Sequence, residues 1–125
     1  MNNLETEAFA RKLLREVWER FDAEVVHEFY HHDVIGHHRA QTLNFDDVVN
    51  RLKWDRKHSS NPTFDIQDII ATDNRFALRF LYAATETATG HAFHVEVIYF
   101  YHLRQGKICE FWLLADQDFD YKAAA

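Results

Sequence analysis

The sequence predicts an α+β fold in which three N-terminal helices pack on a curved antiparallel sheet. Residues 4–60 place apolar side chains three and four positions apart, as amphipathic helices do, whereas residues 63–116 alternate apolar and polar side chains, as strands do. Short turns separate the extended segments, and a short turn joins strands only as antiparallel neighbours. We expect one domain over residues 1–125, because 125 residues suffice for a single core.

Capping residues mark the helices. Asn3 precedes the first apolar stripe and can cap it, and Asp22 can cap the second helix. Asn44 and Asp47 form a capping-box pattern at the start of the third helix, and Pro62 follows the end of that helix. The expected helices cover residues 4–20, 23–30 and 45–58.

Turn residues divide the second half of the chain into strands. Asp73-Asn74, Gly90 and Gly106 are residue types that hairpin turns favour, because they adopt positive φ angles at low cost. The expected strands cover residues 64–70, 75–87, 91–103 and 108–116. Residues 30–38, between the second and third helices, are too short and too Gly-interrupted to be assigned to a helix.

The two faces of the sheet differ in polarity. In the last two expected strands the odd-numbered residues are more apolar, so we assign them to the concave, helix-covered face, and we expect Cys109 to be buried there. The even-numbered face is also too apolar to lie in water. We expect the protein to form a homodimer through the outer face of the sheet. The alternative is a monomer in which the even-numbered residues lie on the helix-covered face and the odd-numbered residues lie outside. The apolar members of this outer-face patch are Leu81, Ile98, Phe100, Trp112 and Leu114.

The composition argues against several classes of protein. A formal net charge of −6, without a Lys or Arg cluster, argues against binding nucleic acid or an anionic membrane. No segment approaches the ~18 apolar residues of a membrane span, and the N-terminus lacks the apolar run of a signal peptide. The one cysteine cannot form an internal disulfide. We therefore expect a cytoplasmic protein. An aromatic content of 15% indicates a bulky core, an apolar interface or an apolar pocket.

Two segments resemble a known superfamily. The segment FYHHDVIGHHR, residues 29–39, is similar to the exit from the second helix in NTF2-like proteins, and LRQGKICEFWLLAD, residues 103–116, is similar to their final hairpin. The chain resembles in particular the SnoaL-like and ketosteroid-isomerase-like branch. The resemblance implies a cystatin-like cone with a cavity between the helices and the concave sheet. It also implies general acid/base catalysis on a small lipophilic molecule, without a cofactor.

The resemblance further implies a position for the catalytic group. In the isomerase branch a carboxylate lies five residues beyond the Asp of the first motif, and that Asp corresponds here to Asp33, so the matching residue is His38. Histidine titrates near neutral pH and can act as a general base. We expect His38 to transfer a proton with help from His37, while a tyrosine of the sheet polarises a carbonyl. The branch's tyrosine on the first helix has no counterpart here.

Aromatic residues are the candidates for the cavity wall. Trp54 lies off the main apolar stripe of the third helix, and Trp18 can serve likewise from the first, although either can also be ordinary core. Tyr99 and Tyr101 share a face because they are two residues apart. No spacing selects among the sheet tyrosines. The expected ligand-binding residues are Trp18, Trp54, Tyr82, Tyr99, Tyr101 and Phe111.

A non-catalytic function is the alternative. Polyketide cyclases of the family carry polar residues on both sides of the tryptophan of the last strand, whereas this chain has Phe111 and Leu113 there. That loss of polarity favours a small-ligand-binding or dimerisation module. Five histidines in residues 27–38 suggest a metal site, but adjacent histidines on an extended segment point to opposite sides. We therefore expect no bound metal.

Overall fold

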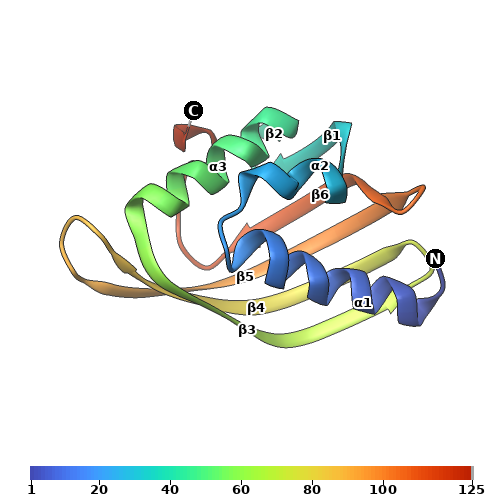
Figure 1. Cartoon of the computed structure of the whole chain (residues 1–125), viewed down its shortest axis with the longest axis horizontal. Helices are drawn as coiled ribbons and strands as arrows, with labels where there is room; N and C mark the ends of the chain where they lie inside the picture. The colour runs from blue at the N-terminus through green and yellow to red at the C-terminus, as the bar shows by residue number, and fades with distance from the viewer. Residues whose placement is uncertain (125) are drawn as a thin grey trace.

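A computed structural model describes residues 1–124 and places a layer of helices on one face of a curved, open, six-stranded sheet (Figure 1). This architecture confirms the α+β prediction. The helical segments are α1 (Asn3–Leu13), η1 (Leu14–Trp18), η2 (Ala23–Val25), α2 (Val26–Phe29), α3 (Phe45–His58) and η3 (Tyr121–Ala124). The strands are β1 (Tyr30–His38), β2 (Gln41–Leu43), β3 (Ser59–Thr72), β4 (Arg75–Glu86), β5 (Ala92–Arg104) and β6 (Lys107–Ala115). Among residues 1–124, no helix has both the length and the apolar character needed to cross a membrane.

The strands follow the order β2-β1-β6-β5-β4-β3 across the sheet. Strands β3 to β6 pair as successive antiparallel neighbours, which confirms the predicted meander. The prediction of a wholly antiparallel sheet is wrong at one place, because β1 runs parallel to β6. A parallel pair needs a long connection, and here most of the chain lies between the two strands.

Strand β1 comes from the segment to which the sequence assigns no element. Its inward positions are Val34, Gly36 and His38, all of which are buried, while Ile35 and His37 point to the other face. Two of these three inward residues are a glycine and a histidine. The alternation of apolar residues that predicts a strand is therefore missing, although the alternation of burial is present.

Side-chain caps begin the two long helices. The first cap is Asn2 rather than the expected Asn3: its side chain accepts a hydrogen bond from the Glu5 N–H, and the Glu5 carboxylate accepts one from the Asn2 N–H. The predicted capping box of Asn44 and Asp47 is confirmed, with backbone-to-side-chain distances of 2.9 and 2.8 Å. Each cap satisfies backbone N–H groups that a helix start leaves unpaired.

The first helix widens into a π-helix over Leu14–Trp18. The Glu19 N–H donates to the Leu14 carbonyl at 2.8 Å, a bond that spans five residues. The extra residue in the turn changes which side chains face the sheet, and the adjacent residues Val17 and Trp18 are both buried. The regular helix expected over residues 4–20 does not predict this change.

Pro62 lies inside a strand rather than between two elements. Helix α3 ends at His58, where the sequence predicts, but β3 begins at Ser59, five residues before the expected start at residue 64. Pro62 falls at an irregularity in the β3–β4 pairing, between Ser60 and Thr63. Since β3 is an edge strand, the missing N–H of proline breaks no ladder on its outer side.

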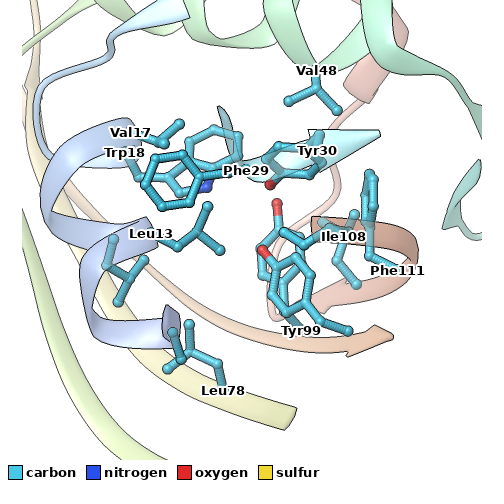
Figure 2. Close-up of a cluster of buried hydrophobic side chains, with 14 of the residues drawn as sticks. Leu13, Val17, Trp18, Phe29, Tyr30, Val48, Leu78, Tyr99, Ile108 and Phe111 are labelled. Atoms are coloured by element: carbon cyan, nitrogen blue, oxygen red, sulfur yellow. The ribbon is translucent and has the colours of Figure 1, made fainter. Parts of the chain in front are cut away.

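The alternation predicts the faces of β5 correctly. Tyr99 and Tyr101 are buried beneath the helices, whereas Ile98 and Phe100 are 47% and 44% exposed on the outer face. Figure 2 shows how the buried face of the sheet meets the helices, with Leu13 opposite Tyr99. The apolar face of the sheet and the apolar stripe of the helices thus form one core.

The predicted phase of β6 is wrong at Cys109. The register pairs Leu103 with Ile108 and His102 with Glu110, so Cys109 is the extra residue of a β-bulge. Ile108 is fully buried, and the half-buried Cys109 donates from its Sγ to the His102 carbonyl at 3.4 Å. The bulge shifts the alternation by one residue at the start of the strand only, so the rest of β6 follows the predicted phase.

Candidate functional site

A pocket of about 540 Å³ lies between the C-terminal half of α3 and the concave face of the sheet. Its ionisable groups include several from α3, while most of its apolar wall comes from the strands. The segment that follows β6 lines it as well. The apolar wall includes Phe64, Phe80, Phe93, Val95, Val97 and Leu113.

Four of the six expected ligand-binding residues lie on the pocket wall, and their role in binding stays a prediction. Tyr101 and Phe111 do not line the pocket; each is 1% exposed in the core. Tyr101 stacks on Phe76, with ring centroids 4.6 Å apart. The pocket occupies one end of the concave face, so sharing a face with Tyr99 does not bring Tyr101 into it. The four residues on the wall are Trp18, Trp54, Tyr82 and Tyr99.

Phe111 packs directly on Gly36. The two residues are register partners in the β1–β6 pair, and a Cβ built on Gly36 would lie 2.2 Å from the Cζ of Phe111. Tyr30 meets the same ring edge-on, at 6.0 Å between centroids. The absence of a side chain at Gly36 therefore makes room for the Phe111 ring, which fills the core instead of contacting a ligand.

His38 lies behind the pocket wall rather than on it. Its side chain is 2% exposed and stacks on Phe119 at 4.3 Å, with Tyr121 at 6.5 Å. Phe119 and Tyr121 do line the pocket, and they stand between it and the imidazole. Burial lowers the pKa of His38, and the nearby Arg39 and Arg51 lower it further. The imidazole is therefore neutral at pH 7.

His37 faces away from the pocket, so the structure does not bring it together with the pocket groups, and its help in proton transfer stays a prediction. Its Nε2 lies 2.7 Å from the Glu110 carboxylate, and its ring stacks on Trp112 at 5.0 Å on the outer face of the sheet. The reason is the pleat of β1, which sends successive side chains to opposite faces. Because His38 points inward, His37 must point outward.

Helix α3 brings a charged pair into the pocket that sequence analysis misses. The Nη2 of Arg51 lies 3.1 Å from the Oδ1 of Asp55, and the two side chains are 16% and 9% exposed. Burial raises the pKa of Asp55, and Arg51 offsets part of that rise. A carboxyl group with a raised pKa in a pocket is a candidate for proton transfer. The signal in the sequence is an aspartate at a buried position of α3, in line with Val48 and Leu52.

His58, the last residue of α3, also lines the pocket. Its Nδ1 lies 2.8 Å from the Trp54 carbonyl oxygen, and its ring stacks on the Trp54 indole at 4.2 Å. Because a carbonyl only accepts, Nδ1 carries the hydrogen, and the Nε2 of the neutral ring carries the lone pair. This arrangement holds the imidazole in one tautomer with a basic nitrogen available.

Three side chains of the pocket wall have a buried polar atom that makes no hydrogen bond of good geometry among the described residues, although Ser59 still interacts with the Tyr82 hydroxyl. They are the indole nitrogen of Trp18 and the phenol oxygens of Tyr82 and Tyr121. Burial raises the pKa of Tyr82 to about 12, so its hydroxyl stays protonated at neutral pH. Buried phenol and indole donors on a pocket wall are candidates for polarising a carbonyl oxygen.

The histidines of residues 27–38 point in different directions. His31 contacts the Arg104 carbonyl at 2.5 Å, His37 contacts Glu110, and His38 lies inside. Across residues 1–124, no three His, Cys, Asp or Glu side chains come together in a way that would hold a metal ion.

Comparison with known proteins gives a consistent result for the fold. The family described as SnoaL-like polyketide cyclase matches residues 8–118. AclR from Streptomyces galilaeus has a TM-score of 0.82 at 19% identity, over 90% of this chain and 79% of its own. PrhC from Penicillium brasilianum has a TM-score of 0.80 at 15% identity, over 91% of this chain and 82% of its own. A SnoaL-like polyketide cyclase from Agrobacterium tumefaciens has a TM-score of 0.76 at 16% identity, over 90% of this chain and 91% of its own. A search of curated protein sequences gave no match.

Proposed function

Because the chain belongs to the SnoaL-like polyketide cyclase family, we propose that it is an isomerase, cyclase or hydrolase that acts on a small lipophilic molecule without a cofactor. The reaction is general acid/base chemistry in the pocket. The observation that carries the proposal is the placement of Arg51, Asp55, His58 and Tyr82 on the wall of one largely apolar pocket. Proton-transfer groups in a pocket from which apolar side chains exclude water are what such chemistry needs.

Three of these polar groups have distinct parts in this proposal. His58 removes a proton from carbon next to a carbonyl group, Asp55 holds and returns a proton, and Tyr82 donates a hydrogen bond to the carbonyl oxygen. The hydrogen bond between His58 and Trp54 supports the first assignment, because in the neutral ring it places the hydrogen on Nδ1 and the lone pair on Nε2. We assign proton transfer to these groups rather than to His38, since Phe119 covers the His38 imidazole.

Exchange of carbon-bound protons tests this function before the natural substrate is known. Bicyclic and tricyclic ketones are incubated with the protein in D2O, and loss of the signal of the protons next to the carbonyl is followed by NMR. We expect exchange above background for the ketones that bind. Val95→Trp, which fills the pocket, should return exchange to background, whereas Ile70→Trp, at a site 69% exposed, should leave it unchanged.

A ligand-binding module without catalysis is the second candidate. It is favoured by Leu113, an apolar residue of the pocket wall at a position where the family resemblance implies a polar one. Ketones that bind the wild-type protein but not Val95→Trp, and whose carbon-bound protons never exchange, would favour this module over an enzyme. Exchange that survives Val95→Trp would place the chemistry outside the pocket and contradict both candidates.

We also propose that two copies of the chain pair through the outer-face patch. Ile98 faces Leu114 and Phe100 faces Trp112 across the β5–β6 pair, and Leu114 is 65% exposed. An apolar patch of this kind is typical of a protein interface. Leu114→Asp should convert a dimer to a monomer in analytical ultracentrifugation at micromolar concentration, while Leu4→Asp, on the helix layer, should not. A wild-type monomer at that concentration would contradict the proposal.

A further inference from the structure

The guanidinium of Arg51 sits in an unusual environment for a cation. Its Cζ lies 4.7 Å from the ring centroid of Trp54, 5.1 Å from that of Phe119 and 5.9 Å from that of Tyr121. Aromatic faces attract a cation but supply no anionic oxygen. The Arg51 side chain is 16% exposed, so water accepts few of the hydrogen bonds that the aromatic rings cannot accept.

Asp55 neutralises Arg51 only in part. A guanidinium presents five N–H donors and matches a carboxylate best through two parallel hydrogen bonds. The pair approaches through Nη2 and Oδ1, which lie 3.1 Å apart, and even a paired carboxylate engages only two of the five donors. Within residues 1–124, Asp55 is the one carboxylate within ion-pair distance of Arg51. Donors of the guanidinium therefore remain for a ligand that enters the pocket.

The charge of Asp55 is itself unfavourable where it lies. Burial raises the pKa of this carboxyl group despite the adjacent Arg51, so the ionised form is held at a cost. A second anion beside Arg51 would raise that cost. An anion on Arg51 and an ionised Asp55 would compete for the same guanidinium, 3.1 Å from the Asp55 carboxylate, so protonation of Asp55 would favour binding of the anion.

We propose that the pocket binds a lipophilic molecule that carries an anionic oxygen, a carboxylate or an ionised enol, and that Arg51 holds this oxygen while Asp55 takes up a proton. The aromatic and aliphatic wall formed by residues such as Phe64, Phe80 and Leu113 accommodates the apolar body of the ligand. Arg51 lies on α3 at the edge of that wall. This inference rests on the proposed function, because it names the chemical class of the molecule that the same pocket takes.

The experiment compares matched probes by isothermal titration calorimetry at pH 7. The first pair is 2-naphthoate and 2-naphthamide, which share size and shape and differ in charge. The second pair is the ionised enol of a bicyclic 1,3-diketone and its neutral enol ether. Comparing the two pairs shows whether the pocket prefers a carboxylate or an enolate. We expect at least one anion to bind about tenfold more tightly than its neutral partner, as a charge-assisted bond to arginine implies. Arg51→Gln should abolish the preference and keep the neutral probe bound. Arg51→Lys should retain part of the preference, and Arg56→Gln, an exposed arginine on the same helix, should retain all of it.

Asp55→Asn supplies a second and independent readout. Wild-type binding of the anion should take up a proton, seen as a binding enthalpy that changes with the ionisation enthalpy of the buffer. Asp55→Asn should abolish this change and tighten anion binding severalfold, because the competing carboxylate is gone. Equal affinity for charged and neutral probes, or a preference that survives Arg51→Gln, would overturn the inference and leave the proposed function intact. Binding of none of the four probes would count against both.

Discussion

Replacing His58 with glutamine is expected to slow proton exchange on a ketone that wild-type protein turns over by about 10²–10⁴-fold, the usual contribution of a positioned general base. The side chain is held in place by the 2.8 Å hydrogen bond from Nδ1 to the Trp54 carbonyl and by stacking on the indole. Glutamine can still donate to that carbonyl but has no basic nitrogen. NMR exchange rates in D2O measure the loss.

Two comparisons separate a catalytic role of His58 from a structural one. His91→Gln changes an exposed histidine near the β4–β5 turn and should leave the rate unchanged. His58→Ala should regain part of its activity when imidazole is added, because free imidazole can enter the space left by the ring. An unchanged rate in His58→Gln would remove His58 from the mechanism.

The largest expected loss of stability comes from Gly36→Ala. The added Cβ would lie 2.2 Å from Cζ of Phe111 and within 2.7 Å of two further atoms of that ring. Phe111 is 1% exposed and is bounded by Tyr30, Tyr99 and Tyr101, so it cannot move aside freely. We expect destabilisation at the upper end of the 1–3 kcal/mol typical of overpacking, about 3 kcal/mol. Thermal unfolding should show it as a melting temperature roughly 10 °C lower.

A double variant identifies the contact responsible. Phe111→Leu shortens the side chain that meets Gly36, so Gly36→Ala should cost much less in that background than in the wild type. A similar cost in both backgrounds would mean that the Phe111 ring is not what the glycine accommodates. The same cycle tests the parallel β1–β6 register, since only that pairing places the two residues opposite each other.

The layers of the fold are predictable because burial is periodic in both halves of the chain. Tyr99 and Tyr101 follow the period of their strand, so apolar alternation predicts which side of the sheet is buried. The helix stripe is predicted less fully, because Leu14 and Val17 are buried but Leu4 is 79% exposed. The parallel pairing of β1 is not predictable in this way. The inward positions of β1 include Gly36 and His38, which give no apolar alternation. Its partner strand β6 lies at the other end of the chain.

In the candidate site, a motif predicts the position of a residue but not the side chains that surround it. The resemblance selects His38, and the structure does turn that residue inward, but Phe119 from the segment after β6 covers it. A local sequence pattern around His38 cannot predict its contact with Phe119, because the two residues are far apart in the sequence. Asp55 was open to prediction, since a carboxylate on the buried stripe of a helix needs a partner, and Arg51 lies one turn before it.

Residues 116–120, between the end of β6 and the buried Tyr121, supply Gln117, Asp118 and Phe119 to the pocket wall. Polar contacts at the surface tie this loop to its neighbours: Asp118 to Arg39, and Asp120 to Gln41. Contacts of this kind contribute little each in water. Because dissolved ions screen a contact between exposed charges, the Asp118–Arg39 pair should hold this part of the pocket wall less tightly at high ionic strength.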